Sequence, residues 1–229
     1  TDGAAAILSV IAVMATISLI LPNFTLTSEG PYYAPVQQAF VGLVSLVLYG
    51  VFLFVQTAKH RQYFLHDDAP GHEHPVLDNR QSLACAALLL ANLVGVILLA
   101  KALTPAVESA VLGAGLPVAF VGVVIALLIL LPEGVTALRF ASANRLQSSL
   151  NAALGSALAT IGLTIPFVAV AALMLDRPLV LGLNAEGMTL LILTLFTSSL
   201  TLATGRTTIL QGAVHLVIFS VFLVLSAVP

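Results

Sequence analysis

The sequence has little charge for its length. Asp, Glu, Lys and Arg make up 8% of its 229 residues, whereas a soluble domain carries about 25%. Hydrophobic residues account for 59%, and the mean hydropathy is +1.10. Such a chain cannot cover a water-facing surface, which excludes a soluble enzyme, and eight basic against ten acidic residues exclude a nucleic-acid-binding protein. The composition predicts a membrane protein.

Cysteine and catalytic motifs are also scarce. Cys85 is the single cysteine, which excludes a disulfide framework and a Cys-based metal cluster. The sequence contains no HExxH motif, no Gly-rich phosphate loop and no Ser-His-Asp order. We therefore expect neither an enzyme nor a bound cofactor.

Apolar runs close to 20 residues long are the main feature of the chain. A hydrocarbon layer of roughly 30 Å requires runs of this length for a spanning helix, whereas a transmembrane barrel shows alternating segments of about ten residues. The sequence predicts an all-α, polytopic fold with about seven transmembrane helices. They are expected at residues 4–21, 36–58, 82–103, 116–140, 146–175, 187–204 and 208–228.

Lys and Arg indicate how the spans are oriented, because cytoplasmic loops are enriched in them. With a cytoplasmic amino end, six basic residues lie inside and two outside, and the carboxyl end lies outside. The inside set is Lys59, Arg61, Arg80, Arg139, Arg145 and Arg206, and the outside set is Lys101 and Arg177.

The longest polar stretch divides the chain. Residues 59–81 form a predicted cytoplasmic loop between two helices in residues 1–58 and five helices in residues 82–229. Histidines and carboxylates from His66 to His74 suit divalent cations. Proline and glycine leave the same stretch without a fixed frame, which favours a solvated linker, with metal binding as the alternative.

Glu133 is the most unusual ionisable residue, because charged groups within spans are costly and by default functional. It lies in Pro132-Glu133-Gly134, after a long apolar run, and apolar spacing resumes beyond it. Pro132 and Gly134 can break or kink a helix and free backbone carbonyls, and transporters bind ions at such breaks. We predict an ion-binding Glu133; the alternative is a helix that ends at Pro132, with Glu133 among the headgroups.

The next span carries a small, polar face. Small residues recur every four positions from Ser148 to Thr164, with Asn151 and Gly155 alongside. Such a face serves helix packing, but an asparagine amide is costly without a partner. If Asn151 and Ser156 face Glu133, they supply the oxygen ligands that Ca²⁺ takes.

Two further features concern the remaining helices. His215, in the last span, fits a packing residue better than a proton relay. A weak internal symmetry (212 − 42 = 170) places Gly42 on Gly212 and Tyr49 on Phe219, and secondary transporters often contain inverted repeats. We expect residues 1–58 to close a first repeat and residues 82–229 to form a second. The chain begins with Thr rather than Met, and we expect the working protein to be longer.

With Pro132-Glu133-Gly134 on one helix and Asn151 and Gly155-Ser156 on the next, the segment from Phe120 to Pro166 resembles the second α-repeat of the calcium/cation antiporter superfamily, and within it the bacterial calcium/proton antiporters. The family's first α-repeat, with its own acidic ligand, has no counterpart in these residues. The similarity rests on Leu131-Pro132-Glu133-Gly134, Ala143-Asn144-Arg145-Leu146-Gln147, Leu150-Asn151, Leu154-Gly155-Ser156-Ala157 and Gly162-Leu163-Thr164-Ile165-Pro166.

The resemblance implies calcium/proton antiport across a bacterial inner membrane by an inverted-repeat cation exchanger fold. Its implied partners are the lipid bilayer, the transported Ca²⁺ and H⁺, and the missing amino-terminal repeat. Na⁺/H⁺ or K⁺/H⁺ antiport is one alternative, and a non-transporting membrane subunit is another. The resemblance implies Glu133, Asn151 and Ser156 as the ligands of the ion and the proton. It implies Pro132, Gly134 and Gly155 as the residues of the helix break and of close helix packing.

Overall fold

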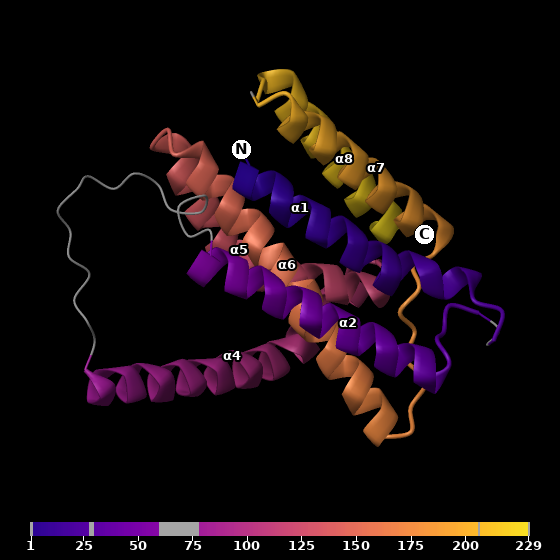
Figure 1. The fold of residues 1–229 in the computed structure, drawn as a ribbon. Helices are drawn as coiled ribbons and strands as arrows, with labels where there is room; N and C mark the ends of the chain where they lie inside the picture. Colours follow the sequence, from indigo (N-terminus) through magenta and orange to yellow (C-terminus); the bar gives the residue numbers. More distant parts are fainter. Residues whose placement is uncertain (1, 28–29, 60–77, 206, 229) are drawn as a thin grey trace. The chain divides into compact units, whose positions relative to one another are not determined.

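The computed structural model describes residues 2–27, 30–59, 78–205 and 207–228. These residues include seven helices long and apolar enough to cross a membrane, which confirms the predicted polytopic all-α class. Figure 1 shows them as α1 (Asp2–Ala15) with its extensions η1 (Thr16–Ile20) and η2 (Leu21–Phe24), α2 (Pro35–Phe54) with η3 (Val55–Lys59), α4 (Asn79–Gly113), α5 (Ala119–Ser142), α6 (Leu146–Met174), α7 (Ala185–Ala203) and α8 (Ile209–Ala227).

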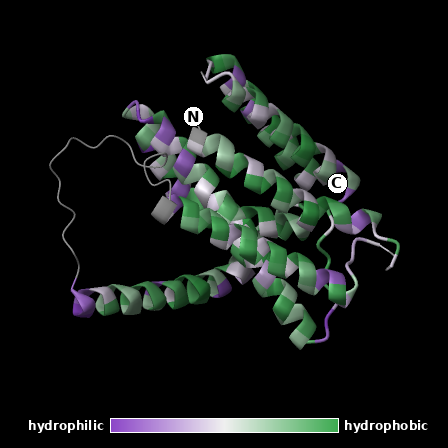
Figure 2. Cartoon of the chain, viewed as in Figure 1, coloured by the Kyte–Doolittle hydropathy of each residue, from purple (hydrophilic) through white to green (hydrophobic). Residues whose placement is uncertain are grey.

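The helices have apolar bodies and polar ends. Figure 2 shows mostly hydrophobic residues along the helix bodies, with hydrophilic ones gathered near the ends and turns. Lipid offers no hydrogen bonds to the backbone, so a spanning segment must pair its own N–H and C=O groups, as a helix does. At the ends, Asn184 Oδ1 caps α7 by accepting the Gly187 N–H at 2.9 Å, and Asp78 caps α4 by accepting the Asn79 N–H at 2.8 Å.

α4 is longer than the sequence predicted. The expected span ended at residue 103, but the helix continues through Pro105 to Gly113. Its 35 residues correspond to roughly 50 Å of helix. The apolar run ends at Leu103, but the helix continues through Thr104 and Glu108 beyond it. A proline removes one backbone donor, and the surrounding turns continue to pair without it.

The chain forms two compact units. The first contains α1, α2, α6, α7, the part of α5 from Glu133 onward, and α8 up to Phe222. The second contains α4 and α5 up to Pro132, together with the last residues of the chain. All the candidate ion ligands, and His215, therefore belong to the first unit.

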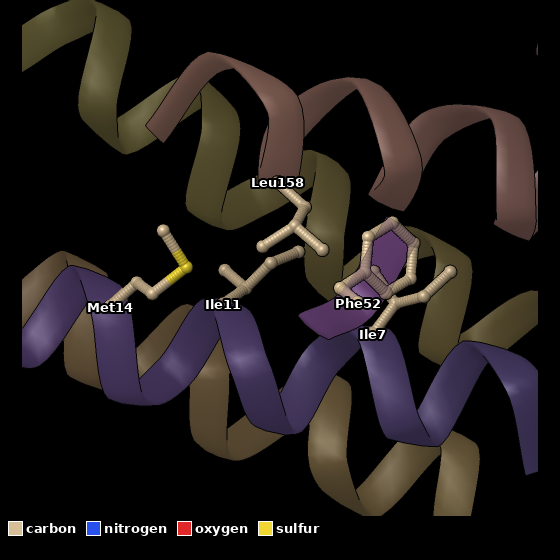
Figure 3. Close-up of a cluster of buried hydrophobic side chains, with 5 residues drawn as sticks. All are labelled: Ile7, Ile11, Met14, Phe52 and Leu158. Carbon is tan, nitrogen blue, oxygen red and sulfur yellow. The ribbon is translucent and has the colours of Figure 1, made fainter. Parts of the chain in front are cut away.

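The apolar core of the first unit lies where α6 packs against α1 and α2. Figure 3 shows the side chains of Ile7, Ile11 and Met14 on α1 gathered with Leu158 and Phe52. Leu158, on α6, has no exposed surface. These contacts hold α1 and α2 on one side of α6.

α2 approaches α6 closely at two points. A Cβ atom added to Gly162 would lie 2.9 Å from the Tyr49 Cβ, so only glycine fits there. Further along α6, the buried Gln38 side chain donates from Nε2 to the Ala169 carbonyl at 2.9 Å. The amide of Gln38 thereby satisfies its hydrogen-bonding need within the helix pair.

A polar junction joins the loop after α1 to the loop before α7. The π-helical turn η1 leaves carbonyls that other segments occupy: Tyr33 Oη donates to the Ile17 carbonyl, and the Leu183 N–H donates to the Leu19 carbonyl at 2.9 Å. The Gly182 N–H also donates to the Pro31 carbonyl at 3.2 Å. These bonds tie α1, α2 and α7 together at one end of the unit.

Replacing Gly162 with alanine tests the close contact with Tyr49. The added methyl group overlaps the start of the Tyr49 side chain, so we expect a loss of about 1–3 kcal/mol in stability, measured by thermal unfolding in detergent micelles. Gly50→Ala on α2 is the control, because a Cβ there meets nothing within 4 Å. Equal melting temperatures for the two variants would contradict the packing described.

Tyr33→Phe tests the junction. The substitution leaves the Ile17 carbonyl without its donor, so we expect a loss of about 1–3 kcal/mol. Burial raises the pKa of the Tyr33 hydroxyl, so its contribution is present below the ordinary tyrosine pKa and is lost as pH rises through the higher folded value. The difference between wild type and Tyr33→Phe should therefore shrink above about pH 10.

Tyr49→Phe is the control for this comparison, because the Tyr49 hydroxyl has no hydrogen-bond partner among the described residues. We expect the melting temperature of Tyr49→Phe to be close to that of the wild type. If the stability difference from wild type changed in the same way at alkaline pH for Tyr33→Phe and Tyr49→Phe, the bond from Tyr33 to the Ile17 carbonyl would not be its cause.

Candidate ion-binding site

Glu133 lies in the middle of a continuous helix. α5 runs from Ala119 to Ser142 through Pro132 and Gly134, so the break predicted at this point is not observed. Pro132 lacks an N–H and leaves the carbonyl of Leu128 without its usual helical donor. The Glu133 side chain is half-buried, and it forms no hydrogen bond or ion pair with the described residues.

Asn151 carries an unpaired amide. It lies on α6, five residues after Leu146, and both its Oδ1 and its Nδ2 are buried without a hydrogen-bond partner. Leaving a buried polar group unpaired costs about 1–3 kcal/mol, so a group without a partner in the chain requires an explanation. Ser18 Oγ, in the π-helical turn η1, is the other such buried atom in the described part of the chain.

The turn between α5 and α6 sets the depths of the candidate ligands. Asn144 adopts a left-handed conformation with φ of 60°, which is common just after a helix. Glu133 precedes the end of α5 by nine residues (142 − 133) and Ser156 follows the start of α6 by ten (156 − 146). Along the helix axes, Glu133 therefore lies roughly 14 Å from the end of α5, and Ser156 roughly 15 Å from the start of α6. Asn151 lies roughly 8 Å from the start of α6.

The three predicted ligands are not joined by direct contacts. Asn151 and Gly155 share one face of α6 because they are four residues apart, whereas Ser156 points roughly 140° away from Asn151 around the helix. In the described structure, none of the Glu133, Asn151 and Ser156 side chains is hydrogen-bonded to another. The fold therefore places Asn151 beside Gly155 and leaves Ser156 on a different face.

The two glycines predicted to pack closely face open space. A Cβ added to Gly134 or to Gly155 would meet no atom within 4 Å. Both positions thus leave room beside the helix that the described residues do not fill. Close packing there stays a prediction for a partner segment outside these residues.

No cluster of three or more His, Cys, Asp or Glu side chains could hold a metal ion among the described residues. The stretch from His66 to His74 falls outside them. A cation at Glu133 would therefore depend on one carboxylate and neutral oxygens from this chain. That donor set suits hard cations such as Ca²⁺, Na⁺ or K⁺, which accept carboxylate, amide and hydroxyl oxygens.

A cavity of about 490 Å³ opens at the start of α6. Its walls include Gln147, which lies one turn before Asn151 on the same face of α6, and Thr201 of α7. From the sequence, Gln147 was indicated only as part of the family motif, and Thr201 was not indicated. Both are polar residues near the end of an apolar helix, and this feature of the sequence could have indicated them.

The sequence analysis also missed the partner of His215. Ser198 Oγ lies 3.2 Å from His215 Nε2. The residues are 17 positions apart in sequence, so their pairing becomes visible only when α7 and α8 are placed side by side. The Ser-Thr-rich run around Ser198 was the available signal.

Comparison with known proteins gives two relatives and one family. The chain is 53% identical over 233 aligned residues to "Putative ionic transporter y4hA" of Sinorhizobium fredii (strain NBRC 101917 / NGR234), with all of this chain and 62% of the relative covered. It is 35% identical over 214 residues to "Sodium-potassium/proton antiporter ChaA" of Escherichia coli (strain K12), with 90% of this chain and 58% of the relative covered. The chain thus spans about three fifths of the length of these relatives.

No solved structure matches the chain significantly. The family model described as "Sodium/calcium exchanger protein" matches residues 85–228, which include α5 to α8 and with them Glu133, Asn151 and Ser156. The match extends over more than half of the 229 residues, and the seven apolar helices fit a multi-pass cation exchanger. The chain belongs to the sodium/calcium exchanger protein family.

Proposed function

We propose that this chain contributes one half of the ion site of a cation/proton antiporter, with Glu133 as the group that holds either the cation or a proton. A single carboxylate cannot bind both at once, so loading one ion requires release of the other. This exclusion couples the two fluxes. Family membership supports transport of a cation, and the relative named as a sodium-potassium/proton antiporter supports the proton as the counter-ion.

The unpaired Asn151 amide is the observation that carries the proposal. Leaving a buried amide unpaired is costly, so we expect it to gain a partner in some state of the protein. A cation can be coordinated by the Asn151 Oδ1, and a water molecule that hydrates the cation can donate a hydrogen bond to the same oxygen. Ser156 adds a hydroxyl oxygen at about the depth of Glu133, from a different face of α6.

The rest of the site would come from outside these residues. The open space beside Gly134 and Gly155 leaves room for another helix, and an amino-terminal repeat with its own carboxylate would fill it. In this arrangement residues 1–58 close the first repeat, and residues 82–229 form the second. The protein would lie in the inner membrane with the amino end of this chain in the cytoplasm, as the distribution of basic residues favours.

The cation is either Ca²⁺ or a monovalent ion. Oxygen ligands on Glu133, Asn151 and Ser156 suit Ca²⁺, which takes six to eight oxygens. The name of the E. coli relative favours Na⁺ or K⁺. Flux measured with each ion in turn separates these candidates, because selectivity depends on the number of ligands and the size of the site.

Glu133→Gln tests the proposed coupling. Glutamine keeps the size of the side chain but neither ionises nor attracts a cation by charge. Removing one member of a buried charge pair typically costs about 3–5 kcal/mol, which is on the order of 100-fold or more in affinity. We expect cation-driven proton flux in everted vesicles containing the whole protein to fall by at least that factor.

Glu186→Gln is the matched control, since Glu186 is exposed in the first turn of α7. It should exchange ions like the wild type. Undiminished exchange by Glu133→Gln with Ca²⁺, Na⁺ and K⁺ would remove Glu133 from the mechanism.

Asn151→Leu separates a ligand role from a structural one. Because the amide has no partner among the residues that the structure describes, its removal should leave the melting temperature unchanged or raise it, while ion exchange is strongly reduced. Asn23→Leu is the contrast, because Asn23 Nδ2 donates to the Ile20 carbonyl at 3.3 Å and should be needed for stability. Full exchange by a stable Asn151→Leu variant would show that the amide binds no ion.

A further inference from the structure

The hairpin of α7 and α8 contains an imidazole whose two nitrogens are both engaged. His215 Nδ1 lies 2.8 Å from the backbone oxygen of Gln211, and Nε2 lies 3.2 Å from Ser198 Oγ. A carbonyl oxygen can only accept, so Nδ1 carries the hydrogen. In the neutral ring, Nε2 therefore accepts the hydrogen of the Ser198 hydroxyl.

His215 faces an apolar cavity of about 320 Å³. The cavity lies between α7 and α8, and its other walls are Leu, Ile, Phe, Gly and Thr residues that include Thr194, Ile218 and Phe219. A purely packing histidine would fill such a space. Here the ring instead forms part of the wall and keeps a hydroxyl within reach of Nε2.

No charged side chain accompanies His215 in this wall, among the residues that the structure describes. α1, which packs on α7, carries no titratable group between Gly3 and Ala15. On α7, Glu186 is exposed in the first turn, twelve residues or roughly 18 Å of helix before Ser198. Arg206, between the two helices, is outside the described residues.

We propose that His215 and Ser198 form a proton-binding site of their own, separate from the carboxylate of Glu133. An incoming proton adds to the lone pair of Nε2, and the new N–H donates to Ser198 Oγ. The Ser198 hydroxyl then turns its hydrogen to the carbonyl one turn earlier, as the neighbouring Ser199 does towards Leu195 at 2.8 Å. No covalent bond other than the new N–H is made or broken, and the ring gains one positive charge.

Protonation has a structural consequence in this setting. A cationic imidazole in an apolar wall is costly unless water or a hydroxyl solvates it. Water drawn to the ring therefore enters the cavity and weakens the contact between α7 and α8. The proposal goes beyond antiport at Glu133 and does not depend on it.

A tryptophan reporter tests the site directly, because the chain has no tryptophan of its own. Phe219→Trp places an indole one turn after His215 on the same face of α8, where a cationic imidazole quenches its fluorescence. The whole protein is reconstituted in lipid nanodiscs, with any tryptophan elsewhere replaced. We expect a fluorescence step as the pH is lowered, because the ring gains its positive charge when the proton binds.

Three variants in this background assign the step. His215→Gln should abolish it. Ser198→Ala should move the midpoint of the step, because the lost hydroxyl is the hydrogen-bond partner of Nε2. Ser199→Ala, the control on the same helix, should leave it in place.

The absence of a step, its persistence in His215→Gln, or an equal shift in Ser199→Ala would overturn the proposal. Phe222 lines the same cavity, so Phe222→Trp repeats the test if Phe219→Trp does not fold. Glu133→Gln separates the two proposals: the step should survive this change even if the variant no longer exchanges ions. A step lost in Glu133→Gln would belong to the carboxylate and would contradict a separate site.

Discussion

The packing of α6 against α1 and α2 is the contact on which the first unit depends. Leu158 is fully enclosed by side chains from both partners, and Gly162 allows Tyr49 to reach the backbone of α6. The buried bond from Gln38 to Ala169 fixes the register of α2 along the same helix. Together these contacts occupy the middle and the far end of α6, and they leave the beginning of the helix for other partners.

The candidate site lies in that remaining part of α6. Asn151 comes before the tightly packed region, close to the cavity beside Gln147, and its amide is buried without a partner. Close packing and an unpaired polar group on one helix suggest a division of roles: one end anchors α6, and the other presents a ligand. The open space beside Gly155 is consistent with a further segment of the protein meeting this end.

Much of the architecture could be predicted from the sequence. Membrane composition and apolar runs gave the number and nature of the helices, because lipid admits few alternatives for the backbone. Two expectations were wrong: α4 continues past residue 103, where its span was predicted to end, and α5 continues through Pro132, where a break was predicted. A proline costs a helix one hydrogen bond, and neighbouring turns can keep the helix going, so its presence alone does not fix a boundary.

Contacts between distant residues could not be predicted. Tyr33 meets the carbonyl of Ile17 and Ser198 meets His215 only after the helices have been placed beside each other. The ligand set could be predicted only in part. The sequence indicated Glu133, Asn151 and Ser156 as polar groups in apolar helices. The spacing of five residues on α6 separates Asn151 from Ser156 by roughly 140° around the helix, so these two side chains do not share a face.

The central claim is that a cation and a proton compete for the Glu133 carboxyl. Carbodiimide labelling measures this most directly, because the reagent adds to a protonated carboxyl in an apolar setting and the product on the Glu133 peptide can be quantified by mass spectrometry. If a cation and a proton compete for this carboxyl, labelling should fall as Ca²⁺, Na⁺ or K⁺ is added at fixed pH and ionic strength. Labelling of Glu133 that is insensitive to all three cations would contradict it.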